Sequence, residues 1–136
     1  MRVWMALVTA LWMAATPAWG QQCDPDEYPE VSQAEIVGNR DAYQGKKVQV
    51  SGTFLFSGSD FCYQIRKTKI HTKDYFCFAL GTPSLVRLYL KKDHPQADVL
   101  MNLRRGAHVT ACGVFDYLGA DYNYLLVDRI HVEPQP

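Results

Sequence analysis

Tyrosines, lysines and arginines occur close together in the middle of the chain, and these residue types suit ligand binding. Tyrosine rings beside cationic side chains are typical of surfaces that stack sugars or single-stranded nucleic acid. We expect a groove with the basic tip at 66–73 as the main anion contact. The alternative is that the tyrosines only pack and the lysines are only solvated. The candidate ligand-binding residues are Tyr63, Arg66, Lys67, Lys69, Lys73, Tyr75, Arg87, Tyr89, Tyr117 and Tyr122. Of these, Tyr63, Tyr75 and Tyr89 are expected to share the exposed groove with Arg87.

No catalytic motif accompanies these residues. The sequence has no G-x-S-x-G nucleophile elbow and no glycine-rich phosphate loop, and its carboxylates fall on turns and helix starts. The histidines His71, His94, His108 and His131 do not have the spacing of metal ligands. The last hairpin would place His108 opposite His131, which favours pairing on an open strand face over a metal site. We therefore expect no enzymatic activity, no cofactor and no bound metal ion.

The four cysteines are typical of a small exported protein with two disulfides. None of their spacings gives a C-x-x-C pair, and three connectivities are open. A hairpin centred between positions 69 and 70 would place Cys62 opposite Cys77, within bridging distance. That pairing leaves Cys23 for Cys112. A shift in register would undo the assignment.

The N-terminus has the pattern of a secretory signal peptide. Arg2 precedes an apolar run over 3–15, and the small residues Ala18 and Gly20 have the spacing of a signal-peptidase site. The run is too short to span a bilayer, which takes about twenty residues. The alternative is a buried N-terminal helix. We expect cleavage near Gly20 and a secreted or periplasmic protein with no transmembrane segment after cleavage.

The overall charge is balanced but unevenly distributed. The 136 residues include fourteen bases and fourteen acids, which argues against nucleic acid as a partner. Residues 40–105 hold twelve bases and five acids, whereas 21–39 hold five acids and no base. A basic middle indicates an anion-binding surface, or else acidic ends that fold over it and neutralise it. The sequence leaves both open.

The elements that must position these residues follow from periodicity. A capping box at Ser32 predicts a helix to about Tyr43. Alternation predicts a strand over 46–56 with a bend or a bulge at Gly52. Further strand-like stretches are 61–67, 75–80, 85–90, 109–115 and 122–130, and a short helix opens at 93–95 and closes at Gly106.

Apart from 57–74, which departs from the pattern, the order is helix, three strands, helix, two strands. This is the layout of the OB-fold, a five-stranded, partly open Greek-key barrel that is mainly β. The stretches 41–53, 106–115 and 124–132 resemble the first-strand entry, fourth strand and fifth strand of small exported bacterial OB-fold proteins. We therefore predict a signal peptide at 1–20, an extended acidic arm at 21–31 and an OB-fold-like domain at 32–136.

OB-folds bind oligonucleotides or oligosaccharides across the second and third strands and between two loops. Because the N-terminal pattern predicts export, we expect a non-enzymatic binding domain for an anionic or carbohydrate ligand of the cell envelope. The alternative is a structural or protein-interaction module of the envelope with no small ligand. The identity of the partner and the oligomeric state are open at this point.

Overall fold

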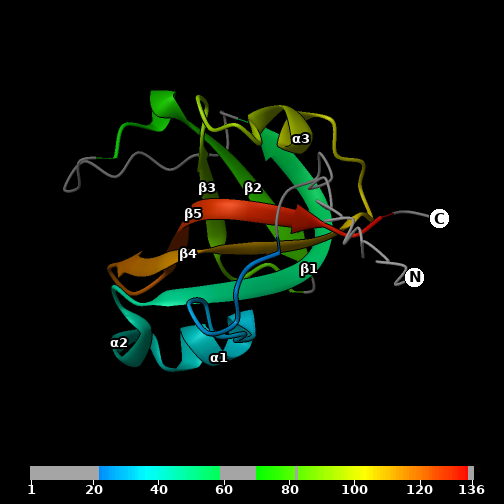
Figure 1. Cartoon of the computed structure of the whole chain (residues 1–136). Coiled ribbons are helices and arrows are strands. Elements are labelled where there is room, and N and C mark those ends of the chain that lie inside the picture. The colour runs from blue at the N-terminus through cyan, green and yellow to red at the C-terminus, as the bar shows by residue number, and fades with distance from the viewer. Residues whose placement is uncertain (1–21, 59–69, 82, 135–136) are drawn as a thin grey trace, which may run out of the picture.

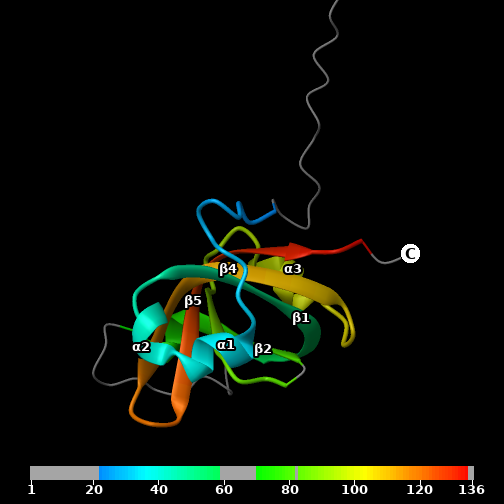
Figure 2. The ribbon, with the colours of Figure 1, turned by 90° about the horizontal axis from the view of Figure 1, so that it is seen from below.

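The computed structural model describes residues 22–58, 70–81 and 83–134. The predicted signal peptide lies outside these ranges, as do the site residues Tyr63, Arg66, Lys67 and Lys69. In the described residues five strands form a closed barrel in the order β1-β2-β3-β5-β4 (Figure 1 and, from below, Figure 2). The predicted fold class, a mainly β barrel of five strands, is therefore confirmed. The strands are β1 (Lys47–Gly58), β2 (Tyr75–Gly81), β3 (Arg87–Lys91), β4 (His108–Leu118) and β5 (Tyr122–Val132).

Short helices lie on opposite sides of the barrel. In Figure 1, α1 (Gln33–Gly38) and α2 (Arg40–Tyr43) lie below it and α3 (Ala97–Met101) above it. A 3-10 turn, η1 (Thr72–Asp74), precedes β2. In the part of the chain that the structure describes, no helix has the length and apolar character needed to cross a membrane.

The single helix predicted from Ser32 to Tyr43 is divided in two. Its start is as expected, since the Ser32 hydroxyl accepts a hydrogen bond from the Glu35 amide at 3.1 Å. The division falls at Asn39, whose φ of −135° and ψ of 46° are not helical. Glycine and asparagine are both poor helix formers, so the Gly38–Asn39 pair explains the break. The break aims Arg40 and Asp41 toward the end of β4.

The barrel interior is filled by alternate aliphatic and aromatic side chains. Its largest fully buried members include Phe78, Leu80, Leu88, Leu90, Phe115, Leu125 and Ile130. Ile36 of α1 and Leu100 of α3 belong to the same cluster and are also fully buried. Burial of one such side chain stabilises the fold by roughly 1.5–3 kcal/mol. The core therefore joins both helical regions to the barrel.

Close to Gly52, where a bend or bulge is predicted, β1 changes partner at Thr53, and its register against β2 shifts between Phe54 and Phe56. Residues 47–53 pair with β4, and residues from 53 onward pair with β2. A Cβ at Gly52 would lie 2.1 Å from the backbone oxygen of Gly81, so only glycine fits. Gly113, at the bulge between β4 and β5, is equally constrained: its Cβ would lie 1.9 Å from the Leu126 oxygen.

The predicted disulfide between Cys23 and Cys112 is present, with the two Cα atoms 6.0 Å apart. It joins the arm to β4 across 89 residues of sequence. Cys77 is disulfide-bonded as well. Its predicted partner Cys62 lies outside the described residues, and the bridge between Cys62 and Cys77 stays a prediction.

Noncovalent contacts also hold the arm against the barrel. Glu30 forms a parallel bridge with Gln49 of β1. Tyr28 is buried, and its hydroxyl donates to Asp128 Oδ2 at 2.7 Å. Removal of its ring from water, and then the Asp128 carboxylate, raise the pKa of Tyr28 to about 12. The arm is thus an integral layer of the domain.

Two glutamine amides complete hydrogen bonds at the barrel edges, which the sequence pattern did not indicate. Gln33 is buried; its Nε2 donates to the Leu80 oxygen at 3.0 Å, and its Oε1 accepts from the Val86 amide at 3.0 Å. Gln96 exchanges two bonds with the backbone of Ile130, at 2.7 and 2.8 Å. Each side-chain amide therefore makes the backbone hydrogen bonds that a neighbouring strand would otherwise make at that edge.

The expected facing of His108 and His131 is wrong. His131 pairs with Thr110, whereas His108 Nδ1 lies 3.5 Å from the Glu133 carboxylate. Two features shift the register. Next to the turn, Leu118 pairs with Tyr122, one residue further along than a His108–His131 pair requires, and the bulge after Cys112 adds a further residue.

Candidate functional site

Four tyrosines from β2, β3 and β5 touch ring to ring. Because Leu88 and Leu90 point into the core, Tyr89 between them points outward. Its ring centroid lies 5.9 Å from that of Tyr75 and 5.8 Å from that of Tyr124. The Tyr122 ring lies 6.1 Å from Tyr124, and its hydroxyl is hydrogen-bonded to that of Tyr89. We call Tyr75, Tyr89, Tyr122 and Tyr124 the tyrosine cluster.

The cluster offers only part of its ring surface to a ligand. Tyr89 and Tyr124 are 0% and 1% exposed, whereas Tyr75 and Tyr122 are partly exposed. Tyr89 therefore does not present the exposed ring that the sequence predicts. The reason is its central position: it pairs with Cys77 on one side and Leu126 on the other, between two further tyrosine rings.

Burial keeps Tyr124 neutral. Loss of hydration, and then the charge and hydrogen bond of Asp116, raise the pKa of Tyr124 to about 12. A neutral hydroxyl beside a carboxylate acts as a donor, so Tyr124 holds Asp116 in place. The buried half of the cluster is a rigid support for the exposed half.

Arg87 lies beside the cluster in the position that the strand pattern predicts. It pairs with Tyr124 in the parallel β3–β5 ladder. Its guanidinium carbon lies 5.4 Å from the ring centroid of Phe56, which is 38% exposed. One guanidinium nitrogen of Arg87 is buried and has no hydrogen-bond partner among the described residues. A cation is therefore fixed next to the aromatic surface.

A cavity of about 350 Å³ adjoins the exposed edge of Tyr75. We call it the basic pocket; its lining residues are Lys73, Asp74, Tyr75, Lys91, Lys92 and Asp93. Lys73 and Tyr75 are predicted site residues, whereas Lys91 and Lys92 were missed. The signal for Lys91 was available, since it alternates in phase with Arg87 and Tyr89 on β3.

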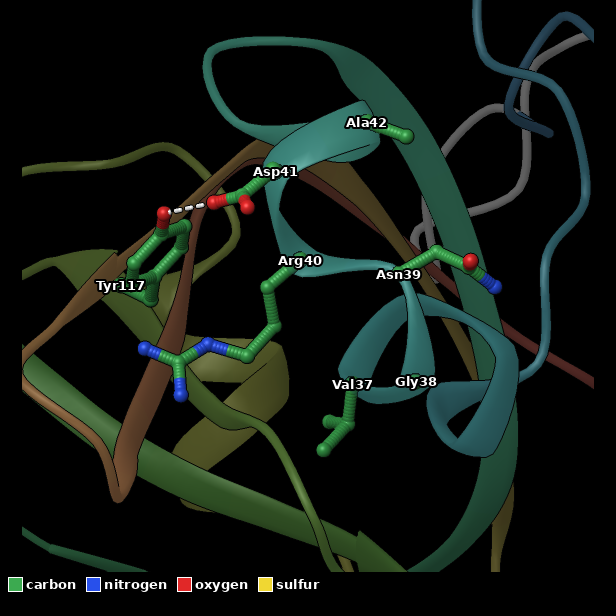
Figure 3. Close-up of a pocket in the computed structure, with 7 residues that line it drawn as sticks. All are labelled: Val37, Gly38, Asn39, Arg40, Asp41, Ala42 and Tyr117. Carbon is green, nitrogen blue, oxygen red and sulfur yellow. Dashed lines mark hydrogen bonds between the residues drawn. The ribbon is translucent and has the colours of Figure 1, made fainter.

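Tyr117 lies apart from the tyrosine cluster, in a second cavity of about 610 Å³ between α1, α2 and β4 (Figure 3). Its hydroxyl donates to Asp41, and this hydrogen bond, followed by loss of hydration, raises the pKa of Tyr117. The Arg40 guanidinium lies over its ring (Figure 3). The Tyr117 hydroxyl and the Asp41 carboxylate satisfy each other, whereas the buried Nε of Arg40 has no hydrogen-bond partner among the described residues. The contacts join α2 to β4, so we interpret the cavity as a structural junction. The lining residues are Val37, Gly38, Asn39, Arg40, Asp41, Ala42 and Tyr117.

The described histidines take part in local contacts. Both ring nitrogens of His94 are hydrogen-bonded to backbone, to the Asp128 oxygen at 2.7 Å and from the Gln96 amide at 3.0 Å. Over the ranges 22–58, 70–81 and 83–134, no three His, Cys, Asp or Glu side chains are grouped so that they could hold a metal ion.

Comparison with known proteins bears on the fold. No known protein family and no curated protein matches the sequence. Solved structures do match: an OBody bound to hen egg-white lysozyme (AM2EP06) is 19% identical over 75% of this chain and 90% of the OBody, with a TM-score of 0.54. A second OBody bound to the same protein (AM3L15) is 18% identical over 78% of this chain and 94% of its own, with a TM-score of 0.53.

Asparaginyl-tRNA synthetase from Pyrococcus horikoshii also matches, at 14% identity, with a TM-score of 0.55. The match covers 76% of this chain but only 23% of the synthetase. At these identities the similarity establishes an OB-fold-like barrel.

Proposed function

We propose that this chain is an exported, non-enzymatic binding domain that takes an anionic or carbohydrate ligand of the cell envelope on the outer face of β2, β3 and β5. The observation that carries the proposal is the tyrosine cluster. The partly exposed rings of Tyr75 and Tyr122 rest on buried tyrosines, with Arg87 at their side. A fixed aromatic surface beside a cation suits a sugar ring that carries negative charge.

The position of the cluster supports this assignment. The faces of the second and third strands are where OB-folds bind oligosaccharides and oligonucleotides. The balanced charge of fourteen bases and fourteen acids favours the sugar, because nucleic-acid binding relies on many uncompensated cations. Export is supported by the N-terminal pattern and by the disulfide between Cys23 and Cys112, since such bonds persist in oxidising compartments.

The test is equilibrium binding of the processed protein to a panel of neutral and acidic envelope polysaccharides at low and high salt. We expect binding to an acidic polymer that weakens as salt rises. Tyr75→Ala and Arg87→Gln should each lower the affinity about tenfold or more, as loss of a stacked ring or a charged contact does. Lys46→Gln is the matched control, because Lys46 is exposed and lines none of the cavities described above.

The predicted basic tip at 66–73 allows a second set of variants in the same binding test. Charge reversal at Lys67 and Lys69 should reduce binding to the acidic polymer further. Equal binding by the wild type and all of these variants would overturn the proposed ligand-binding face.

A second candidate is an envelope module that binds a protein. One observation favours it: the OBody structures, which share the barrel over 90% and 94% of their length, are bound to another protein, lysozyme. The burial of Tyr89 and Tyr124 also leaves less ring surface exposed than a sugar-stacking groove of four tyrosines would offer. Absence of binding to every polysaccharide in the panel would exclude the first function and favour this one.

A further inference from the structure

We propose that the basic pocket holds a phosphate or sulfate monoester on a sugar whose ring stacks on Tyr75. This inference rests on the proposed function and specifies the chemical class of its ligand. It concerns one end of the tyrosine cluster, where Tyr75 belongs both to the cluster and to the pocket lining.

The backbone fixes the geometry of the pocket. Tyr75 of β2 pairs directly with Lys91 of β3, so their side chains leave the sheet on the same outer face. Lys73 comes from η1, just before β2, and Lys92 directly follows β3. The Lys92 amide donates to the Asp74 carbonyl at 2.8 Å, which joins the two walls. The three lysines therefore come from two segments that a backbone hydrogen bond joins.

The charges leave a positive surplus. Lys73, Lys91 and Lys92 line the pocket with the carboxylates Asp74 and Asp93. Within the described residues none of these lysines forms an ion pair. Lys92 Nζ lies 5.4 Å from the Phe76 ring centroid, a contact that still leaves its donors available. Lysines act as mobile point charges, which suits a tetrahedral anion approached from several sides.

Tyr75 distinguishes a sugar ester from a free anion. Its ring is partly exposed, and edge contact with buried Tyr89 at 5.9 Å restricts its orientation. A sugar stacked on this ring would carry its charged substituent into the pocket. The volume of about 350 Å³ lies within the range of about 300–1,000 Å³ usual for small-ligand sites. A bare anion would make no use of the ring.

The experiment is an NMR titration of the ¹⁵N-labelled, processed protein with glucose 6-phosphate, glucose 6-sulfate, glucose and inorganic phosphate. The two esters should shift amides at 73–75 and 91–93, and bind about tenfold more tightly than glucose or phosphate alone. Comparison of the two esters identifies the preferred anion. Equal affinity for inorganic phosphate and glucose 6-phosphate would overturn the proposal that a sugar ring stacks on Tyr75.

Variants test the pocket itself. The double variant Lys91→Gln, Lys92→Gln should lose ester binding by about tenfold or more, because two charged contacts are removed. Tyr75→Leu should weaken ester binding and leave the response to inorganic phosphate unchanged, and Lys46→Gln should alter neither. Unchanged ester affinity in the double lysine variant, with a folded spectrum, would overturn the inference.

The outcome also separates this inference from the proposed function. If the double lysine variant retains polysaccharide binding while Tyr75→Ala loses it, the assignment of the charged ester to the basic pocket is wrong and the proposed binding face is supported. If the esters bind at 73–75 and 91–93 but no polysaccharide binds, the pocket stands and the proposed function falls.

Discussion

The guanidinium carbon of Arg40 lies 3.9 Å from the ring centroid of Tyr117, so the charge lies over the aromatic face. The same guanidinium donates to the carbonyl oxygens of Gly119 and Ala120 in the turn between β4 and β5. Arg40 is available for these contacts because the helix breaks at Asn39. This one side chain thus connects the helical segment to the last hairpin.

Replacement of Arg40 by lysine should loosen that turn. Lysine keeps the charge but loses the planar fork that reaches two carbonyls while stacking on Tyr117. The loss should cost about 1–2 kcal/mol, combining the cation–π contact and a hydrogen bond. Amide hydrogen exchange at 119–121 should accelerate, with little change in β1. Identical exchange in Arg40→Lys and wild type would show that the turn is held by other contacts.

Gly52→Ala should destabilise the barrel strongly. The new methyl group would lie 2.1 Å from the Gly81 oxygen, so the backbone of β1 or β2 must move. We expect a loss at or above the upper end of the roughly 1–3 kcal/mol usual for overpacking, measured by urea unfolding. Gly38→Ala is the control: nothing lies within 4 Å of its Cβ, and alanine favours the helix by about 1 kcal/mol. Similar destabilisation by both substitutions would contradict the explanation.

Removal of the disulfide by Cys23→Ala with Cys112→Ala should lower the free energy of unfolding by about 2–5 kcal/mol. The bridge spans 89 residues, so it strongly restricts the unfolded chain. The barrel should still fold, because Cys23, Tyr28 and Cys112 form a cluster separate from the main core. Proteolysis should then cut first within 22–31. An arm as protected as in the wild type would mean that Tyr28 and its neighbours hold it alone.

Stability should fall as the pH rises above about 10. The pKa values of Tyr28 and Tyr124 are raised to about 12, so the folded state favours their neutral forms. Their contribution is complete below the ordinary tyrosine pKa and is lost as the pH rises from about 10 through 12, on the order of 2–3 kcal/mol for each residue. Urea unfolding at pH 8, 10 and 11 measures the slope. Tyr28→Phe should make it shallower, and an unchanged slope would contradict this origin.

Gln33→Leu should be costly although leucine is apolar and similar in size. The amide of Gln33 bonds the Leu80 carbonyl and the Val86 amide, and leucine would leave both groups buried without a partner. Each unsatisfied group costs about 1–3 kcal/mol. Thermal unfolding of Gln33→Leu beside Gln44→Leu, an exposed position, isolates the effect. Equal melting temperatures would show that other groups satisfy this backbone.

Much of the fold could be predicted from sequence because alternation and glycine spacing are local signals. The glycine beside the partner change of β1 and the cap at Ser32 both follow from residues within a few positions. The register of the last hairpin could not be predicted, because the bulge after Cys112 depends on close approach of Gly113 to the Leu126 backbone. Such contacts between distant segments leave no periodic trace.

The sequence predicts which residues come together in the candidate site better than it predicts how exposed their side chains are. Tyr75, Tyr89 and Tyr122 do converge, since strand alternation fixes the face on which they lie. Their burial is decided by neighbours from other strands: Tyr124 covers Tyr89, and no local pattern indicates it. Arg40 was missed for the same reason, as its partners are 79 and 80 positions away.

The parallel ladder between β3 and β5 closes the barrel over residues 87–89 and 124–126, far fewer pairs than join β4 to β5. This short seam runs directly beside the ring contact between Tyr89 and Tyr124. The rings that form the candidate ligand surface therefore also stabilise the closure of the barrel between β3 and β5. A molecule bound across them would resist opening at the joint where the fewest backbone bonds must break.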